Sequence, residues 1–225
     1  MKFNIITLYP DFYSQIFSFG VINRALIQNK IDIEIYNLRD FADDKRGSVD
    51  DTPFGGGAGM ILRADILYKA LKNITDKEET YSIMLSASGV KFDQKKAANL
   101  SEKKNITLIC SKFEGFDERI LKYTDLELSI GDYVLSSGEY ASLCVLDSVV
   151  RLIPGVLGNG ESLSEESFSD PKMLEYPQYT RPKNFMGEFV PEILVSGDHK
   201  KVSEYRKKKA LEKTRKNRAD LITTH

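Results

Sequence analysis

The sequence predicts an α/β domain with a mainly parallel sheet, followed by a small, basic and largely helical C-terminal domain. Strand-like and helix-like stretches alternate regularly as far as Leu152, which is typical of a parallel sheet with crossover helices. A stretch rich in Gly, Ser and Glu then separates this region from a strongly basic one. We therefore expect a main domain at 1–158, a linker at 159–171 and a C-terminal domain at 172–225.

The first elements combine period-two and helical patterns. Residues 3–8 form a β-rich run, and residues 12–28 carry a helical pattern. Residues 31–38 alternate isoleucines with acidic side chains, as a strand with one covered face does. Residues 39–59 are polar and then glycine-rich, so they are predicted to form a long loop, and long loops in compact domains are usually functional or disordered.

The same alternation continues through the rest of the main domain. Loops follow strand-like runs at Ser86, Ser111 and Ser129. Because ligands of parallel sheets bind beyond the carboxyl ends of the strands, these three loops could line one pocket. Strands are predicted at 81–85 and 106–110, with an acidic and apolar segment at 125–128, and helices at 63–73, 92–100 and 140–152.

The segment 129–139, S-I-G-D-Y-V-L-S-S-G-E, combines small residues with a position just before an apolar helix. Small side chains leave main-chain amides and carbonyls uncovered, so this segment could bind a flat heterocycle through its backbone. An ordinary junction between a strand and a helix explains the same composition. The segment alone leaves both interpretations open.

Charge is distributed unevenly along the chain. Residues 200–218 hold ten lysines and arginines against two glutamates, a net charge of +8. Because the whole chain carries −1, the remaining residues carry −9. A basic end on an acidic body suggests a polyanionic partner. The alternative is the solvated face of a terminal helix, which is predicted at 203–218.

Composition argues against several classes of protein. No apolar run approaches the roughly 20 residues that span a bilayer, and the N-terminus has a strand pattern without a signal-peptide cleavage site, so we expect a cytoplasmic protein. Cys110 and Cys144 lie in apolar runs, where buried thiols are expected rather than a disulfide. With only His199 and His225 besides, no Cys/His metal site is expected.

The glycine-rich stretch at 55–59 differs from the familiar nucleotide-binding motifs. It is neither G-x-G-x-x-G, because Met60 takes the last position, nor G-x-x-x-x-G-K-[ST], and no strand precedes it. This argues against a dinucleotide oxidoreductase or a P-loop enzyme. The stretch does place exposed backbone near Asp50 and Asp51, whose carboxylates can accept hydrogen bonds from N1–H and the amino group of a guanine. Guanine recognition and a structural turn both remain open.

Several motifs, in this order, resemble those of the bacterial tRNA (guanine-N1)-methyltransferases, which modify the guanosine immediately 3′ to the anticodon. The resemblance covers nearly the whole chain. The motifs are L-R-D-F at 38–41, V-D-D-x-P-F-G-G-G-A-G-M at 49–60, E-G-F-D-E-R at 114–119, S-I-G-D-Y-V-L at 129–135, R-L-I-P-G-V-L at 151–157, Y-T-R-P at 179–182 and S-G-x-H at 196–199.

This resemblance implies a trefoil knot of the SPOUT type in the C-terminal part of the α/β domain, with S-adenosylmethionine bound in the knot. It also implies a homodimer whose active sites are shared between subunits, so that Glu175 reaches the partner's cofactor. A requirement for magnesium is implied too, although the sequence has no dedicated ligand cluster. The implied cofactor-binding residues are Leu85, Ser86, Ala87, Ser111, Phe113, Glu114, Ile130, Gly131, Asp132, Tyr133, Val134, Leu135, Ser137, Gly138 and Glu175.

The chemistry of the implied reaction gives two residues a role. Guanine N1 carries a proton at neutral pH, so methylation needs a base and a cation that stabilises charge growing on O6. The resemblance assigns the base to Glu166 and the cation to Arg151. The expected substrate-binding residues are Asp50, Asp51, Gly57 and Gly59 for the guanine and Lys207 and Lys208 for the tRNA.

The chain departs from the family's pattern at several of these positions. Glu166 replaces the usual Asp and places the carboxylate one methylene further out. Residues 86–89 are S-A-S-G instead of S-P-Q-G, and hydroxymethyl groups at Ser111 and Ser137 replace glycine hydrogens and could crowd the cofactor. We therefore expect an active tRNA methyltransferase, with a catalytically drifted tRNA-binding homologue as the alternative.

Overall fold

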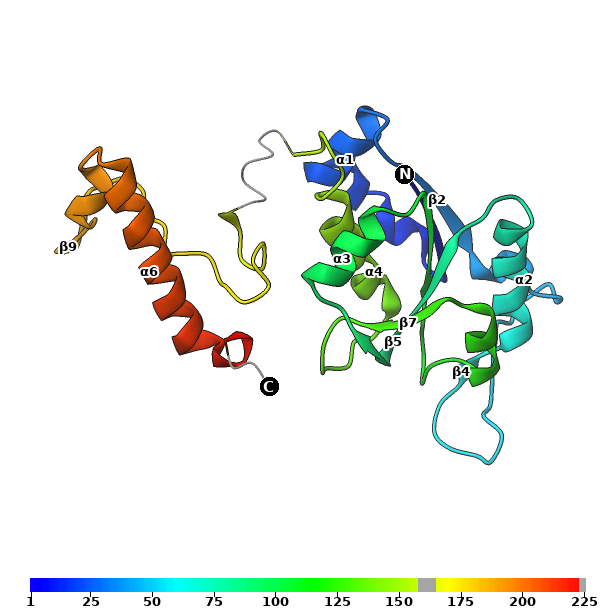
Figure 1. Ribbon diagram of the computed structural model, residues 1–225. Helices are drawn as coiled ribbons and strands as arrows, with labels where there is room; N and C mark the ends of the chain where they lie inside the picture. The colour runs from blue at the N-terminus through cyan, green and yellow to red at the C-terminus, as the bar shows by residue number, and fades with distance from the viewer. Residues whose placement is uncertain (158–164, 223–225) are drawn as a thin grey trace. The chain divides into compact units, whose positions relative to one another are not determined.

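The computed structural model describes residues 1–157 and 165–222. The chain forms two compact units, Met1–Gly158 and Asn159–His225. In Figure 1 the first unit is coloured from blue to green and the second from yellow to red. Among the helices of the described residues, none has the length and apolar character needed to cross a membrane.

The first unit is built around a five-stranded sheet in which every neighbouring pair is parallel, in the order β2-β1-β6-β5-β7 (Figure 1). This confirms the predicted α/β domain with a mainly parallel sheet. The strands are β1 (Lys2–Thr7), β2 (Asp32–Asn37), β5 (Tyr81–Lys91), β6 (Asn105–Cys110) and β7 (Leu126–Ser129).

Two helical layers cover the two faces of this sheet. Successive side chains of a strand point to opposite faces, so Phe3 and Ile5 of β1 join one buried cluster and Ile6 joins the other. The first cluster includes α1 (Gly20–Ile27), α3 (Gln94–Ser101) and α4 (Gly138–Val150), and the second includes α2 (Ala64–Thr75). The described residues of this unit also form the 3₁₀ helices η1 (Pro10–Tyr13), η2 (Ile16–Ser18), η3 (Leu38–Phe41) and η4 (Glu118–Tyr123), and the short strands β3 (Asp50–Asp51) and β4 (Ile61–Leu62).

The structure corrects three predictions. The helix predicted at 12–28 is interrupted, because Phe19 adopts an extended conformation (φ −145°, ψ 171°) and only α1 follows it. The loop predicted at Ser86 lies inside β5, where the register with β7 shifts between Leu85 and Val90. Cys144 is exposed, because the helical period of α4 turns it away from the buried cluster, whereas Cys110 is buried as predicted.

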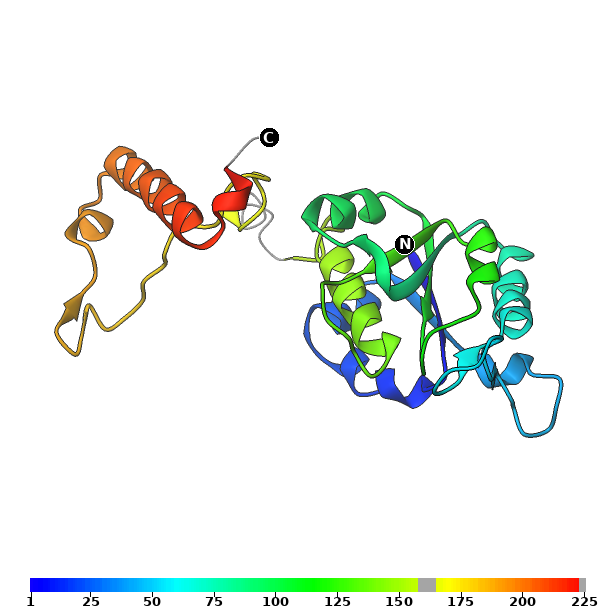
Figure 2. The ribbon, with the colours of Figure 1, turned by 90° about the horizontal axis from the view of Figure 1, so that it is seen from below.

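The second unit has α6 (His199–Asn217) as its main helix, four residues longer at its N-terminus than predicted. Asp198 caps this helix by accepting a hydrogen bond of 3.1 Å from the Lys201 amide. The segment 165–176 lies against the C-terminal part of α6 (Figure 2), where the Thr214 hydroxyl accepts a 3.0 Å bond from the Leu174 amide. The remaining elements are β8 (Asn184–Phe185), β9 (Glu188–Phe189), η5 (Glu192–Val195) and η6 (Ala219–Leu221).

Candidate functional site

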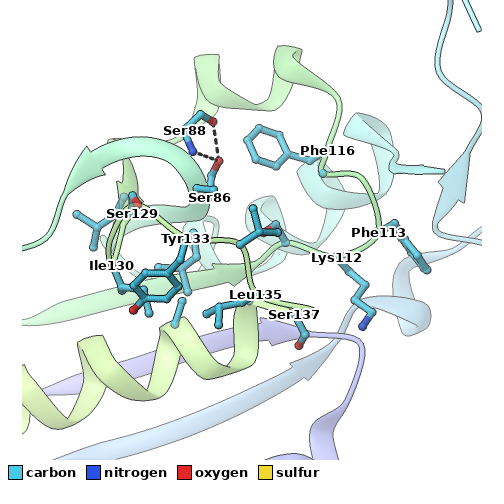
Figure 3. Close-up of a pocket in the computed structure, with 18 of the residues that line it drawn as sticks. Ser86, Ser88, Lys112, Phe113, Phe116, Ser129, Ile130, Tyr133, Leu135 and Ser137 are labelled. Atoms are coloured by element: carbon cyan, nitrogen blue, oxygen red, sulfur yellow. Dashed lines mark hydrogen bonds between the residues drawn. The ribbon is translucent and has the colours of Figure 1, made fainter. Parts of the chain in front are cut away.

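A pocket of about 280 Å³ opens at the carboxyl ends of β6 and β7 (Figure 3). Its walls come from the irregular part of β5 at 85–88, the loop 111–116 after β6, and residues 128–135 at the end of β7. Ser137, Gly138 and Ala141, at the start of α4, complete the lining. The structure thus brings together the three segments that were predicted to share one pocket, although the segment at Ser86 belongs to β5.

All the expected cofactor-binding residues line this pocket except Asp132 and Glu175. The Asp132 side chain is exposed and lies 3.7 Å from the Lys91 ammonium group. Glu175 belongs to the second unit, where its amide donates a 3.0 Å bond to the Ser167 hydroxyl and its carboxylate accepts from Gln178. The pocket within one chain is therefore formed entirely by residues 85–141.

Gly138 lets α4 approach β6 closely. Its amide donates a 2.9 Å hydrogen bond to the Ser111 carbonyl. A Cβ atom at position 138 would lie 2.6 Å from the Ser111 amide nitrogen, a backbone atom that cannot move aside. The requirement for glycine here is steric, and it fixes two pocket segments against each other.

A buried carboxylate lies directly behind this junction. Glu139 is 1% exposed, and its carboxylate accepts hydrogen bonds from the Ser137 hydroxyl and, at 2.5 Å, from the Thr7 hydroxyl. The Ser137 backbone is extended (φ −169°), which any residue can adopt. The hydroxyl of Ser137 is thus bound to Glu139, so this departure from the family pattern has a structural use.

Next to Glu139 lies a small buried polar cluster of Tyr13, Cys110 and Ser142. The Tyr13 hydroxyl lies 2.8 Å from the Ser142 hydroxyl and 3.4 Å from the Cys110 sulfur. Burial, with the nearby Glu139 charge, raises the pKa of the Cys110 thiol. This thiol stays protonated and contributes to packing, and it is not a nucleophile.

The glycine-rich loop is held beside the pocket by two pieces of backbone pairing. It connects β3 (Asp50–Asp51) to β4 (Ile61–Leu62), which pair antiparallel. The Glu114 amide donates a 3.0 Å hydrogen bond to the Met60 carbonyl. Gly59 also lies close to Glu114, because a Cβ atom on Gly59 would lie 2.4 Å from Glu114 Cγ. Because Glu114 lines the pocket, the base of the loop lies against the pocket wall.

The four residues expected to bind guanine lie in or next to this loop. Asp50 is half-buried in β3, and Asp51 is exposed, with its carboxylate accepting 2.8 Å from the Thr52 amide. Gly57 and Gly59 are exposed at positive φ. The structure therefore places the base of the glycine-rich loop at the pocket wall, with Asp50 and Asp51 in the strand that leads into the loop. Carboxylates and exposed backbone of this kind are suited to a polar heterocycle.

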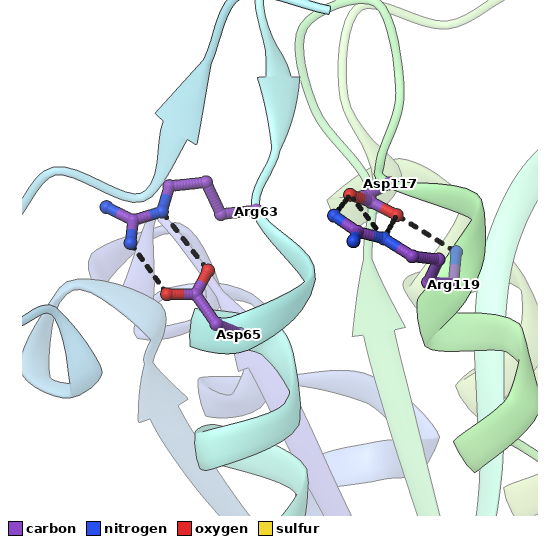
Figure 4. Close-up of polar contacts among 4 residues, drawn as sticks. All are labelled: Arg63, Asp65, Asp117 and Arg119. Atoms are coloured by element: carbon purple, nitrogen blue, oxygen red, sulfur yellow. Dashed lines mark hydrogen bonds and ion pairs between the residues drawn. The ribbon is translucent and has the colours of Figure 1, made fainter. Parts of the chain in front are cut away.

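Two arginine–carboxylate pairs flank the same region (Figure 4). Arg63, which follows β4, lies 2.6 Å from Asp65, and Arg119 lies 2.5 Å from Asp117. Hydrogen bonds from the two arginines lower the pKa of Asp65 and of Asp117. Each pair joins residues only two positions apart and is partly exposed, so it contributes little stability.

The two expected catalytic residues belong to different units. Arg151 is the C-cap of α4, so the 13-residue helix separates it from Gly138 by about 20 Å. Glu166 is half-buried in the second unit, where its carbonyl accepts from the Ser169 amide at 3.1 Å and hydroxyl at 2.8 Å. Arg151 therefore lies at the opposite end of α4 from the pocket of its own chain.

The residue next to Glu166 has contacts of its own. The Glu165 carboxylate accepts a 2.7 Å bond from the Tyr176 hydroxyl and lies 3.8 Å from the Arg206 guanidinium. Burial and this hydrogen bond raise the pKa of Tyr176. Lys207 and Lys208, the expected tRNA-binding residues, are exposed on α6.

The predicted site residues did not include Glu139 and Thr7, which lie next to the pocket, or seven of the residues that line it: Ser88, Lys112, Gly115, Phe116, Leu128, Ser129 and Ala141. The Lys112 ammonium group donates a 2.8 Å hydrogen bond to the Ser136 carbonyl. An acidic residue at the start of an apolar helix was a signal for Glu139, but nothing in the sequence connects it to Thr7. Within residues 1–157 and 165–222, no group of three or more His, Cys, Asp or Glu side chains could hold a metal ion.

Comparison with known proteins gives one family. The sequence profile described as tRNA (Guanine-1)-methyltransferase TrmD matches residues 1–224. The protein named tRNA (guanine-N(1)-)-methyltransferase from Pelagibacter ubique is 50% identical, over 96% of this chain and 95% of its own. The protein of that name from Borrelia garinii is 48% identical, over 98% of this chain and 92% of its own. The protein of that name from Dictyoglomus turgidum is 45% identical over 99% of this chain and 90% of its own.

Proposed function

This chain belongs to the tRNA (guanine-1)-methyltransferase family, and we propose that its target is the guanosine immediately 3′ to the tRNA anticodon, position 37. The family's reaction is the transfer of a methyl group to N1 of a guanine in tRNA. The observation that carries the proposal is the glycine-rich loop, with Asp50 and Asp51 at its start, held against the pocket wall at Glu114.

The pocket suits S-adenosylmethionine, the methyl donor that a methyltransferase of this family implies. Small residues at 86–88, 111 and 137–138 expose main-chain groups that can bond an adenine, while Leu85, Ile130 and Leu135 provide apolar walls. When bound, the cofactor supplies an activated methyl group on its sulfonium. The proposed trefoil knot around this site rests on membership of the family.

The chain's own residues supply proton transfer and charge stabilisation. In our proposal the Glu166 carboxylate removes the N1 proton, and the Arg151 guanidinium stabilises negative charge on O6. Asp50 and Asp51 accept from the exocyclic amino group and so select guanine. Because the residues present offer no metal-ligand cluster among those described, we assign no step to magnesium.

The position of Arg151 supports a dimer with shared active sites. Arg151 lies about 20 Å along α4 from Gly138, farther than an arginine side chain extends from its own Cα. In our proposal Arg151 serves the pocket of a second copy, as Glu175 does, and the dimer acts on tRNA in the cytoplasm. The basic residues of α6, Lys207 and Lys208 among them, bind the phosphate backbone.

The decisive experiment is methyl transfer from labelled S-adenosylmethionine to unmodified tRNA with guanosines at positions 36 and 37. We expect 1-methylguanosine at position 37, and no product on a matched tRNA with adenosine there. Calorimetry of S-adenosylmethionine binding distinguishes an active enzyme from a catalytically drifted homologue, because the drifted homologue would bind tRNA but not the cofactor. Methylation at another guanosine would contradict the proposed target.

A further inference from the structure

A second pocket, of about 420 Å³, lies wholly within the second unit. It is lined by the segment 176–183, by η5 residues and by Arg206 of α6. The proposed methyl transfer makes no use of this pocket. Its lining differs from that of the first pocket in charge: it holds three cations and no acidic residue, whereas one cation, Lys112, and one acid, Glu114, line the first pocket.

The charged residues of this second pocket are all positive. Arg181, Lys183 and Arg206 line it, and no Asp or Glu does. Arg206 is already engaged, since its guanidinium stacks 4.6 Å from the Tyr176 ring centre and lies 3.8 Å from Glu165. Arg181 and Lys183 are exposed and make no ion pair among the described residues, so they are available to a phosphate group.

The remaining lining is suited to a planar, apolar surface. Tyr179 is 48% exposed, and Leu194 and Val195 of η5 face the same pocket. Unstacked bases of RNA loops bind by stacking on aromatic side chains, while nearby arginines and lysines hold the adjoining phosphate. Aromatic and cationic residues next to one another therefore fit a nucleotide better than they fit an acidic peptide, which would leave the tyrosine face unused.

We propose that the second-unit pocket binds one unstacked nucleotide of the tRNA other than the methylated guanosine, with its base on Tyr179 and its phosphate at Arg181 and Lys183. The proposal rests on tRNA being the substrate. This contact positions the RNA and takes no part in methyl transfer.

The test compares two pocket variants with matched controls in the full-length protein. Tyr179→Ala should weaken binding of unmodified tRNA about tenfold, and Tyr179→Phe should retain wild-type affinity, because stacking needs the ring and not the hydroxyl. Arg181→Glu should weaken binding further than Lys172→Glu, the same charge change on an exposed residue of this unit outside the pocket. The measurements are dissociation constants by filter binding, and kcat and KM for tRNA.

We expect KM for tRNA to rise while kcat at saturating tRNA is unchanged. Unaltered affinity in both pocket variants would overturn the proposal, and so would equal losses in Arg181→Glu and Lys172→Glu. A change of molecular mass in sedimentation would show that the pocket holds a second protein chain instead. Failure of the wild type to methylate position 37 would overturn the proposed function alone, because the affinity comparison needs no turnover.

Discussion

The carboxylate of Glu139 accepts a 2.5 Å hydrogen bond from the hydroxyl of Thr7, which lies 132 positions earlier in the chain. Thr7 is the last residue of β1, and Glu139 is in the first turn of α4, where the helix dipole favours a negative charge. Because the same carboxylate binds Ser137, one buried side chain joins the end of β1 to the lining of the first pocket.

We expect Glu139→Ala to lower the free energy of unfolding by about 2 kcal/mol, because it leaves the buried Thr7 hydroxyl and the half-buried Ser137 hydroxyl without their acceptor. Affinity for S-adenosylmethionine should fall as well, since Ser137 and Gly138 lose their support. Urea denaturation and calorimetry measure the two effects. Glu118→Ala, at an exposed position of η4, is the matched control and should change stability by less than about 0.5 kcal/mol. Equal stabilities of the two variants would contradict the structural role.

The parallel sheet could be predicted from the sequence because its strands are apolar runs that can be recognised without knowing their partners. Residues 86–89 do not form such a run. They lie between Leu85 and Val90, which both pair with Leu128 of β7, so the strand continues past them only through a long-range contact. The pairing of β3 with β4 was missed for the same reason, since two residues are too few for a period.

The candidate site shows the same limit. Its loops could be predicted because they follow strands, whereas the partners of Glu139 and the distance between Gly138 and Arg151 depend on the folded helix. Cys144 was predicted to be buried because its neighbours are apolar, but the rotation of α4 sets its exposure. Sequence patterns thus indicate which segments meet, and the structure is needed to show which side chains do.

Substitution of Glu166 tests its proposed role as the general base. Glu166→Gln should lower turnover at least about 100-fold and leave cofactor affinity intact, because an amide cannot accept the N1 proton. Glu165→Gln is the neighbouring control, and it should leave turnover nearly unchanged. Single-turnover kinetics with labelled S-adenosylmethionine measure both. If Glu165→Gln is damaging and Glu166→Gln harmless, the base has been assigned one residue too late.

Mixing two inactive variants tests the shared active site. Gly138→Ala should abolish cofactor binding, because the new Cβ would lie 2.6 Å from the Ser111 amide nitrogen. Arg151→Ala should leave the pocket intact and remove the cation. In a co-refolded heterodimer, the intact pocket of the Arg151→Ala chain is served by Arg151 of the Gly138→Ala chain. We therefore expect methyl transfer to return. No recovery, with heterodimers verified by mass, would show that Arg151 acts within its own chain.

The basic face of α6 should control tRNA affinity without controlling the choice of base. Reversing Lys207 and Lys208 to Glu should weaken binding of all tRNAs alike and reduce the slope of log K against log salt by about 1 for each lost phosphate contact. Reversing Lys95 and Lys122, two exposed lysines of the first unit, is the control for the change in net charge.

Asp50→Asn should have the opposite effect, since it alters a group proposed to accept from guanine and leaves the basic face untouched. We expect tRNA affinity to stay within about threefold, while the preference for guanosine over inosine at position 37 falls, because inosine lacks the exocyclic amino group. Competition between the two tRNAs in one methylation assay measures this preference. If Asp50→Asn weakens binding of both tRNAs equally and leaves the preference intact, Asp50 supports the loop and does not select the base.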